Sequence, residues 1–139
     1  MKDVHFAIAM SLLIALTGAV AGQVQQALNR SVNGRPDTDI QIGVYVNVNP
    51  DCTSGPLPSI QLISPPEHGN VSVKQGKWTA TNYKQCLAVE VPAFVAFYRS
   101  RSDFEGIDVV LLEVKYAGGK TELQKISVIV STGTGGKGT

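Results

Sequence analysis

The chain has 139 residues, 43% of them hydrophobic, with twelve basic and eleven acidic residues and a formal net charge of +1. This length fits one domain. A nearly neutral chain without clustered Lys and Arg excludes the electrostatic footprint of a nucleic-acid-binding protein. The densest basic spot, Arg99 and Arg101, is followed at once by Asp103 and Glu105, so no nucleic-acid partner is expected.

The first residues have the pattern of a secretory signal. Lys2 precedes an apolar run over residues 6–16, and Ala19-Val20-Ala21 follows it, which matches a cleavage site of the A-x-A type. The apolar run is shorter than the about 20 residues that a spanning helix needs. We therefore expect residues 1–21 to be a signal peptide, with an uncleaved anchor as the alternative. The mature chain is expected to have no membrane span and to reach the periplasm or the extracellular space.

The mature chain reads as a series of short strands. Residues 22–38 are polar and predict a flexible N-terminal arm. Residues 39–48 alternate strictly, with Tyr45 on the outward face and the apolar residues on the other: Ile40, Ile42, Val44, Val46 and Val48. Three prolines and a glycine make residues 49–58 a loop, and residues 59–64 predict the next strand.

A hairpin is expected next. Residues 70–74 and 77–81 alternate on either side of Gln75-Gly76, which predicts a two-residue turn. Residues 82–86 read as irregular. The strands over 89–98 and 109–116 are the central pair, residues 117–120 form a loop, and residues 121–130 form the last strand. Residues 131–139 are rich in Gly and Thr and predict a disordered tail.

About seven antiparallel strands with turn signals every 8–12 residues, and no convincing helix, are typical of an immunoglobulin-like β-sandwich. This domain is expected to cover residues 39–130. A small β-barrel is the competing all-β architecture, because periodicity alone does not separate the two.

The mature chain contains two cysteines, Cys52 and Cys86. An even pair in an exported protein predicts a disulfide. The alternatives are a nucleophilic cysteine and a metal site, which would need carboxylates to complete four ligands because the mature chain has a single histidine.

Two spaced motifs carry a resemblance to a known family. Pro66, His68 and Gly69 open a P-x-H-G-x-V-x-V element, and a Y-x5-F-x-G-x-D-x5-V element is formed by Tyr98, Phe104, Gly106, Asp108 and Val114. In this order the motifs resemble the bacterial cadherin-like and immunoglobulin-like repeats of large exported adhesins, over about residues 40–130. The chain departs from them in having Ser100 where a proline is usual, and a single copy. The resemblance implies an immunoglobulin-like fold and an exported bacterial protein.

The motif residues also have physical roles of their own. Phe104 is expected to plug the end of the core, and Gly106 to take a positive φ or a close backbone contact. Asp108 is expected to accept loop N–H groups, and Tyr98 to pack its ring on the core while its hydroxyl donates a hydrogen bond.

The sequence contains no set of residues typical of a reaction centre. His68 is the only mature histidine, no nucleophile motif accompanies it, and we predict no catalytic residue. Asp103, Glu105 and Asp108 form the densest acidic group. Calcium binding is the alternative to a turn-capping role there, but neither a metal nor another cofactor is expected.

Three aromatic residues, Tyr45, Trp78 and Tyr83, form a possible ligand face, because such rings offer apolar area with a polar end. Trp78 has a core position beside the disulfide as its alternative. The sequence thus indicates a small exported bacterial protein with a binding or structural role toward an unknown protein or glycan, and not an enzyme. A carbohydrate-binding or enzyme-associated module is the second hypothesis, and a small hydrolase is the third.

Overall fold

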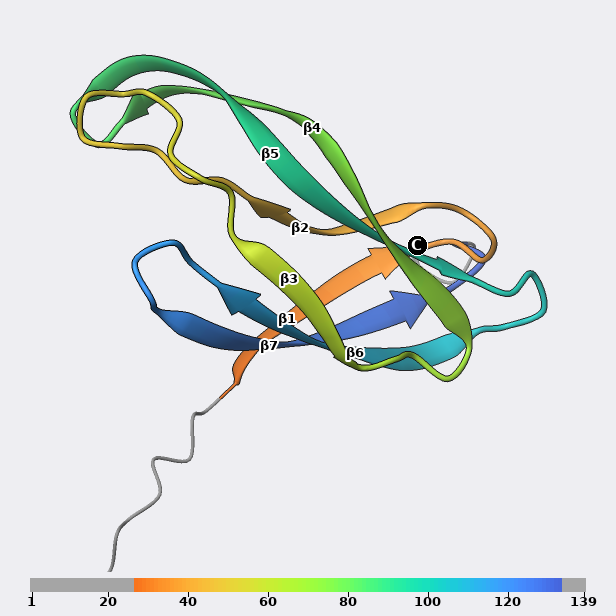
Figure 1. Ribbon diagram of the computed structural model, residues 1–139. Helices are drawn as coiled ribbons and strands as arrows, with labels where there is room; N and C mark the ends of the chain where they lie inside the picture. Colours follow the sequence, from red (N-terminus) through yellow and green to blue (C-terminus); the bar gives the residue numbers. More distant parts are fainter. Residues whose placement is uncertain (1–26, 134–139) are drawn as a thin grey trace, which may run out of the picture.

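The computed structural model describes residues 27–133, and all of its regular structure is β-strand (Figure 1). The predicted signal peptide, residues 22–26 of the predicted arm and residues 134–139 of the predicted tail lie outside the described residues. The strands are β1 (Leu28–Gly34), β2 (Ile40–Tyr45), β3 (Ser59–Ser64), β4 (Gly69–Tyr83), β5 (Cys86–Ser100), β6 (Gly106–Lys115) and β7 (Thr121–Val130).

The strands form two sheets, one with the order β1-β7-β6-β3 and the other with the order β2-β5-β4. The all-β class and the count of seven strands are confirmed. All pairs are antiparallel except β1 with β7, which is parallel. The prediction of a wholly antiparallel domain is therefore wrong for that pair.

One apolar core lies between the sheets. Alternating residues of β6 and β7 face inward and meet residues of β2 and β5. The sequence pattern predicted this alternation for β7, whereas β6 reads as almost wholly apolar. The largest side chains that are fully buried belong to Tyr98, Ile42, Leu112, Ile126, Val110, Val114, Val128 and Pro58. Each aliphatic side chain of this kind stabilises the fold by about 1.5–3 kcal/mol relative to exposure.

The flexible arm predicted for residues 22–38 is wrong over Leu28–Gly34, which form β1. Every residue of β1 pairs with a residue of β7, from Leu28 with Gln124 to Gly34 with Val130. Most of its side chains are exposed, so the strand has no apolar alternation. It is a strand because its backbone pairs with β7, which the sequence pattern does not reveal.

The hairpin turn predicted at Gln75-Gly76 is also wrong. Both residues lie inside β4, where they pair with Phe94 and Ala93 of β5. The chain instead reverses after Tyr83, where Asn82 and Lys84 both take a φ of +53°. One strand more at β1 and one strand fewer here leave the predicted count of seven unchanged.

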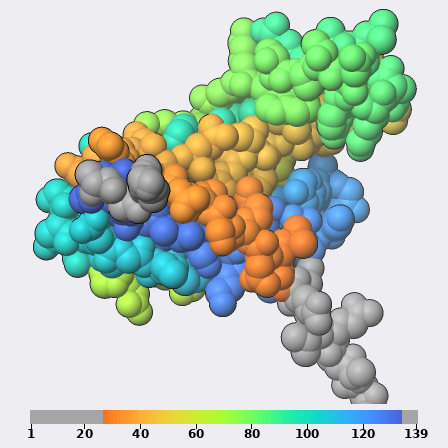
Figure 2. Space-filling model, turned by 180° about the vertical axis from the view of Figure 1, so that it is seen from behind, coloured from red at the N-terminus to blue at the C-terminus, as the bar shows by residue number. Residues whose placement is uncertain are grey.

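The β4–β5 hairpin buries opposite faces along its length. Near the sheet pair, Ala96 and Tyr98 of β5 point into the main core, whereas farther out Val89 and Val91 are buried on the other face. The pairing with β4 runs without a register shift through both halves. The outer half therefore packs against something other than the four-stranded sheet. Figure 2 shows this half standing clear of the rest of the molecule.

Candidate functional site

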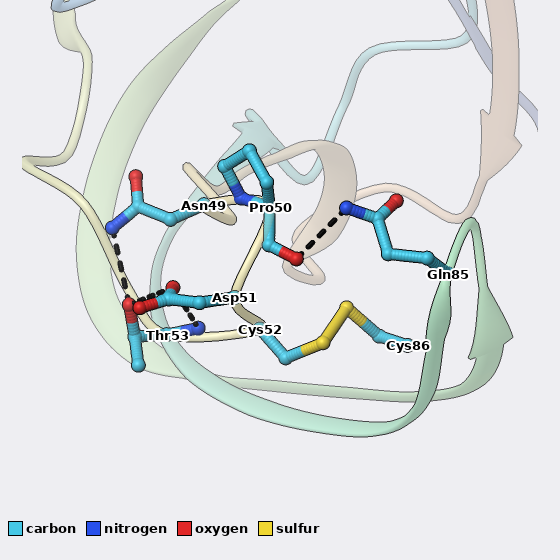
Figure 3. Close-up of a disulfide and its surroundings, with 7 residues drawn as sticks. All are labelled: Asn49, Pro50, Asp51, Cys52, Thr53, Gln85 and Cys86. Atoms are coloured by element: carbon cyan, nitrogen blue, oxygen red, sulfur yellow. Dashed lines mark hydrogen bonds between the residues drawn. A yellow bond between two sulfur atoms is a disulfide. The ribbon is translucent and has the colours of Figure 1, made fainter.

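The outer half of the hairpin and the β2–β3 connection together form a unit that we name the stapled lobe, comprising residues 46–56 and 76–93. Cys52 of the connection and Cys86 of β5 form a disulfide with an S–S distance of 2.08 Å (Figure 3). This pairing confirms the prediction. The bridge joins residues 34 positions apart, and closing a loop of this length stabilises the fold by roughly 4 kcal/mol in the chain-entropy model.

The stapled lobe has a small apolar cluster of its own. Val46, Val48 and Cys52 of the connection pack against β4 and β5, where Cys86, Val89 and Val91 are buried and Trp78 and Tyr83 are half-buried. The rings of Trp78 and Tyr83 meet edge to face, with centroids 5.1 Å apart. Aromatic pairs prefer this arrangement because the positive edge of one ring meets the negative face of the other. The predicted core position of Trp78 beside the disulfide thus holds for this second cluster.

Hydrogen bonds order the connection around the disulfide, as Figure 3 shows. The backbone N–H and the hydroxyl of Thr53 both donate to Asp51 Oδ1, and Asn49 Nδ2 donates to Thr53 Oγ1. The two Thr53 bonds lower the pKa of the Asp51 carboxyl. Across the lobe, Gln85 Nε2 donates to the carbonyl of Pro50 at 2.8 Å. The connection is therefore held to the hairpin by a covalent bond and by a hydrogen bond.

A recess of about 190 Å³ opens at the tip of the stapled lobe. It is lined by the ring of Tyr83, by the polar residues Asn49, Lys84 and Gln85, and by Val48, Pro50 and Cys86. Lys84 Nζ lies 5.3 Å from the centre of the Tyr83 ring. An aromatic ring beside amide groups is suited to a ligand that has both apolar and polar surface.

Sequence reasoning identified Tyr83 of this recess and missed its polar residues. Asn49, Lys84 and Gln85 follow no motif, since they lie in loops with no periodic pattern. The available signal was the disulfide itself. If Cys52 and Cys86 are bridged, the residues on either side of them must be close in space.

Tyr45 does not belong to this surface, so the predicted outward position of Tyr45 is wrong. A β-bulge between Gln41 and Gly43 shifts the register of β2 against β5, and such a bulge reverses the faces on which later residues lie. Tyr45 is only 4% exposed, and its hydroxyl donates to Gln124 Oε1 at 2.6 Å. Burial raises the pKa of this hydroxyl. The predicted ligand face therefore loses Tyr45; of its other two residues, Tyr83 lines the recess, whereas Trp78 packs in the cluster beside the disulfide.

The two sequence motifs meet at the opposite end of the molecule. The buried carboxylate of Asp108 accepts hydrogen bonds from the backbone N–H groups of Glu67, His68 and Val109 and from the Tyr98 hydroxyl. Burial alone would raise the pKa of Asp108, but these four bonds hold it below its usual value. Burial and the Asp108 carboxylate raise the pKa of Tyr98. Asp108 thus fixes the β3–β4 connection to β6.

The remaining motif residues support this arrangement. Gly69 has no room for a side chain, since a Cβ there would meet the Tyr98 ring at 2.8 Å. Gly106 has a φ of +140°, as predicted, and Pro66 is buried. Phe104 is half-buried and stacks on the His68 ring, with centroids 4.2 Å apart. The prediction of a buried plug is therefore wrong in degree, because Phe104 packs against the main core but is only half-buried.

The three carboxylates considered for calcium have separate partners. Asp103 pairs with Arg101 at 3.4 Å, Glu105 accepts the N–H of Thr132, and both Asp108 oxygens accept hydrogen bonds. Over residues 27–133, no group of three His, Cys, Asp or Glu side chains lies close enough to hold a metal ion.

Comparisons with protein-family models, curated proteins and solved structures give no match to this chain. In the described part of the chain, no helix is long and apolar enough to cross a membrane.

Proposed function

We propose that the protein is an exported bacterial binding protein with an immunoglobulin-like fold, and that the stapled lobe is its contact surface. The observation that carries this proposal is that the lobe has its own disulfide and apolar cluster and stands clear of the main core. A projection stabilised in this way keeps one shape when it meets a partner, which lowers the entropic cost of binding.

Export is supported by the disulfide, because such bonds persist in oxidising compartments such as the periplasm. The immunoglobulin-like, cadherin-like fold is supported by two packed sheets and by the way the two motifs converge on Asp108. The same geometry favours binding over catalysis. Asp108, the buried carboxylate of the acidic group, already accepts hydrogen bonds on both oxygens, which disfavours a role for it as a catalytic base.

The test compares two exposed apolar residues, one leucine and one isoleucine, at opposite ends of the molecule. Leu87, at the hairpin tip, is 82% exposed, and Ile107, at the start of β6, is 64% exposed. The mature protein, Leu87→Asp and the matched control Ile107→Asp are immobilised and exposed to cell-envelope extract, and the captured proteins and glycans are quantified. A component retained by the wild type and Ile107→Asp but lost by Leu87→Asp supports the proposal. Capture that Leu87→Asp retains and Ile107→Asp loses contradicts it.

A carbohydrate-binding role is the second candidate, and the recess lined by Tyr83, Asn49 and Gln85 favours it. Trp78 contacts Tyr83, so its fluorescence reports on ligands at that ring. The mature protein is titrated with soluble bacterial and plant polysaccharides, and Tyr83→Ser serves as the control. Quenching by one polysaccharide that Tyr83→Ser abolishes supports this role. Lack of binding to any polysaccharide tested counts against it.

A further inference from the structure

The connection between β2 and β3 contains a small hairpin, which we name the cap and which comprises residues 47–55. Gly55 N donates to the carbonyl of Asn47 at 2.9 Å, and Val48 and Ser54 pair as an antiparallel bridge. The donors and the acceptors of these bonds all belong to the connection. The bonds therefore shape the cap, but they do not hold it against the β4–β5 hairpin.

The contacts that hold the cap against the β4–β5 hairpin are of a different kind. Within residues 27–133 they are the disulfide and the hydrogen bond from Gln85 Nε2 to the carbonyl of Pro50, both drawn in Figure 3, and the packing of Val48 and Cys52 on the apolar cluster of the stapled lobe. A two-stranded hairpin on its own is marginally stable in water at best. The cap therefore keeps one position only as long as these contacts hold it.

The disulfide contributes most among these contacts. A single hydrogen bond between exposed groups gives little net stabilisation, and the half-buried Val48 gains only part of the stabilisation of full burial. Ordering residues 47–55 has an opposing cost, because conformational entropy is lost at every residue that is ordered. Cys52 adds to this cost, since its φ of +70° lies in the left-handed region that residues with a side chain rarely adopt. When the bridge opens, the remaining contacts do not offset these costs.

The main core does not depend on the cap. The described residues that are buried between the two sheets, among them Tyr98 and Leu112, form one apolar cluster, and none of them lies in the cap. Cys86 and Val89 belong to the separate cluster of the stapled lobe, and Figure 2 shows the lobe standing clear of the rest of the molecule. Release of the cap therefore removes contacts from the lobe and leaves those between the sheets in place.

We propose that the Cys52–Cys86 disulfide is a redox switch, which an external dithiol opens to release the cap while the two sheets stay folded. Cys52 is the entry point, because it is half-buried whereas Cys86 is only 3% exposed. A thiolate of the dithiol attacks Cys52 Sγ, forms a mixed disulfide and expels Cys86 as a thiolate. The second thiolate of the dithiol then attacks the dithiol's own sulfur in the mixed disulfide and expels Cys52. The dithiol ends as a disulfide, and its two protons end on the two cysteine thiols.

The switch regulates the contact surface proposed above, and this consequence rests on the proposed function. In the oxidised protein the cap packs on the face of the hairpin that carries Val89, Val91 and Trp78. In the reduced protein this apolar face is uncovered and the lobe no longer keeps one shape. A partner that recognises the oxidised lobe then binds more weakly, because the lobe must be ordered again on binding.

Hydrogen–deuterium exchange of the oxidised mature chain, and of the chain reduced by the small dithiol dithiothreitol, tests the release of the cap without any partner. We expect amides of residues 47–55 to exchange about tenfold faster or more after reduction, and those of β6 and β7 to exchange as before. Quenching of tryptophan fluorescence by acrylamide should increase as well, because Trp78 is the single tryptophan of the chain and packs beside the disulfide. The double variant Cys52→Ser, Cys86→Ser is the control. It should match the reduced chain and should not respond to dithiothreitol.

Cap amides that exchange equally in the oxidised and the reduced chain overturn the proposal, and so does a bridge that dithiothreitol leaves intact in the folded protein. Loss of protection throughout β6 and β7 on reduction also overturns it, because the disulfide would then hold the whole fold together. These outcomes are read on the wild type, so they do not depend on the folding of the double variant. The capture experiment with Leu87→Asp tests the proposed function separately. Faster exchange of the cap on reduction, together with capture that Leu87→Asp retains and Ile107→Asp loses, supports the switch and refutes only the contact surface.

Discussion

Replacing Asp108 tests whether its carboxylate holds the motif end of the molecule together. Asp108→Ala removes the acceptor of four hydrogen bonds, at 2.9 Å from His68 N, 3.0 Å from Glu67 N and Val109 N, and 2.7 Å from the Tyr98 hydroxyl. A buried donor left without a partner costs about 1–3 kcal/mol. Tyr98 is fully buried, and the His68 N–H is partly so. We therefore expect a loss of about 3–5 kcal/mol of unfolding free energy.

Asp108→Asn is expected to lose about 2–4 kcal/mol. It keeps one acceptor oxygen, but its NH₂ group faces two backbone N–H donors if it takes the Oδ1 position, and the His68 N–H if it takes the Oδ2 position, where the Tyr98 hydroxyl can turn to accept. Asp103→Ala is the control, because Asp103 is exposed and pairs with Arg101, and an exposed pair contributes about 0–1 kcal/mol. Urea unfolding of the oxidised protein at neutral pH measures all three. A cost below about 1 kcal/mol for Asp108→Ala, or a cost equal to that of Asp103→Ala, would refute this reasoning.

The pH dependence provides an independent readout of the same group. The folded pKa of Asp108 lies below its unfolded value, which is about 4. The ionised Asp108 carboxylate therefore stabilises the folded state fully above the unfolded pKa, and this stabilisation is lost as the pH falls through the folded pKa. Wild-type stability should fall more steeply below about pH 4 than that of Asp108→Asn. Parallel acid curves for the two proteins would show that Asp108 does not contribute in this way.

The other predictions concern the disulfide, the Phe104 ring and calcium. The mature protein from an oxidising compartment should show no free thiol under denaturing, non-reducing conditions, because Cys52 and Cys86 are bridged; labelling of two thiols per chain would contradict the pairing. Phe104→Ala should cost about 1–3 kcal/mol, below the about 3–5 kcal/mol of a buried ring, because the side chain is only half-buried; urea unfolding measures it, and a larger loss would show that Phe104 is a buried plug. The melting temperature should be the same in millimolar calcium and in a chelator, since both Asp108 oxygens already accept hydrogen bonds. A calcium-dependent rise in melting temperature that Asp108→Asn abolishes would contradict this.

Strands that bury alternate side chains in the main core were predictable from the sequence. The strand over residues 121–130 appears where periodicity placed it, and the strand over residues 59–64 and the loop at 117–120 appear where prolines and glycines in the sequence indicated them. β1 was not predictable, because its stability comes from backbone pairing with β7. The turn at Gln75-Gly76 was misread because a Gln-Gly dipeptide suits a turn, whereas the register with β5 continues through it.

The candidate site was predictable where covalent chemistry or aromatic character marks it. The pair Cys52 and Cys86, with Trp78 and Tyr83 nearby, could be recognised from residue type. Tyr45 was misplaced because a single bulge in β2 reverses the alternation, and a bulge leaves no mark in an apolar and polar pattern. The projecting shape of the stapled lobe depends on the hairpin changing its buried face, which only the packing of both halves reveals.

Site-specific photo-crosslinking in cells tests the central claim, that the stapled lobe contacts the partner, most directly. A photoreactive residue is placed at Leu87 on the lobe in one strain and at Ile107 at the opposite end in another, both of which are exposed positions. We expect a discrete covalent adduct with the partner from the photoreactive residue at Leu87, and no such adduct from the one at Ile107. An adduct from Ile107 with none from Leu87 would contradict it.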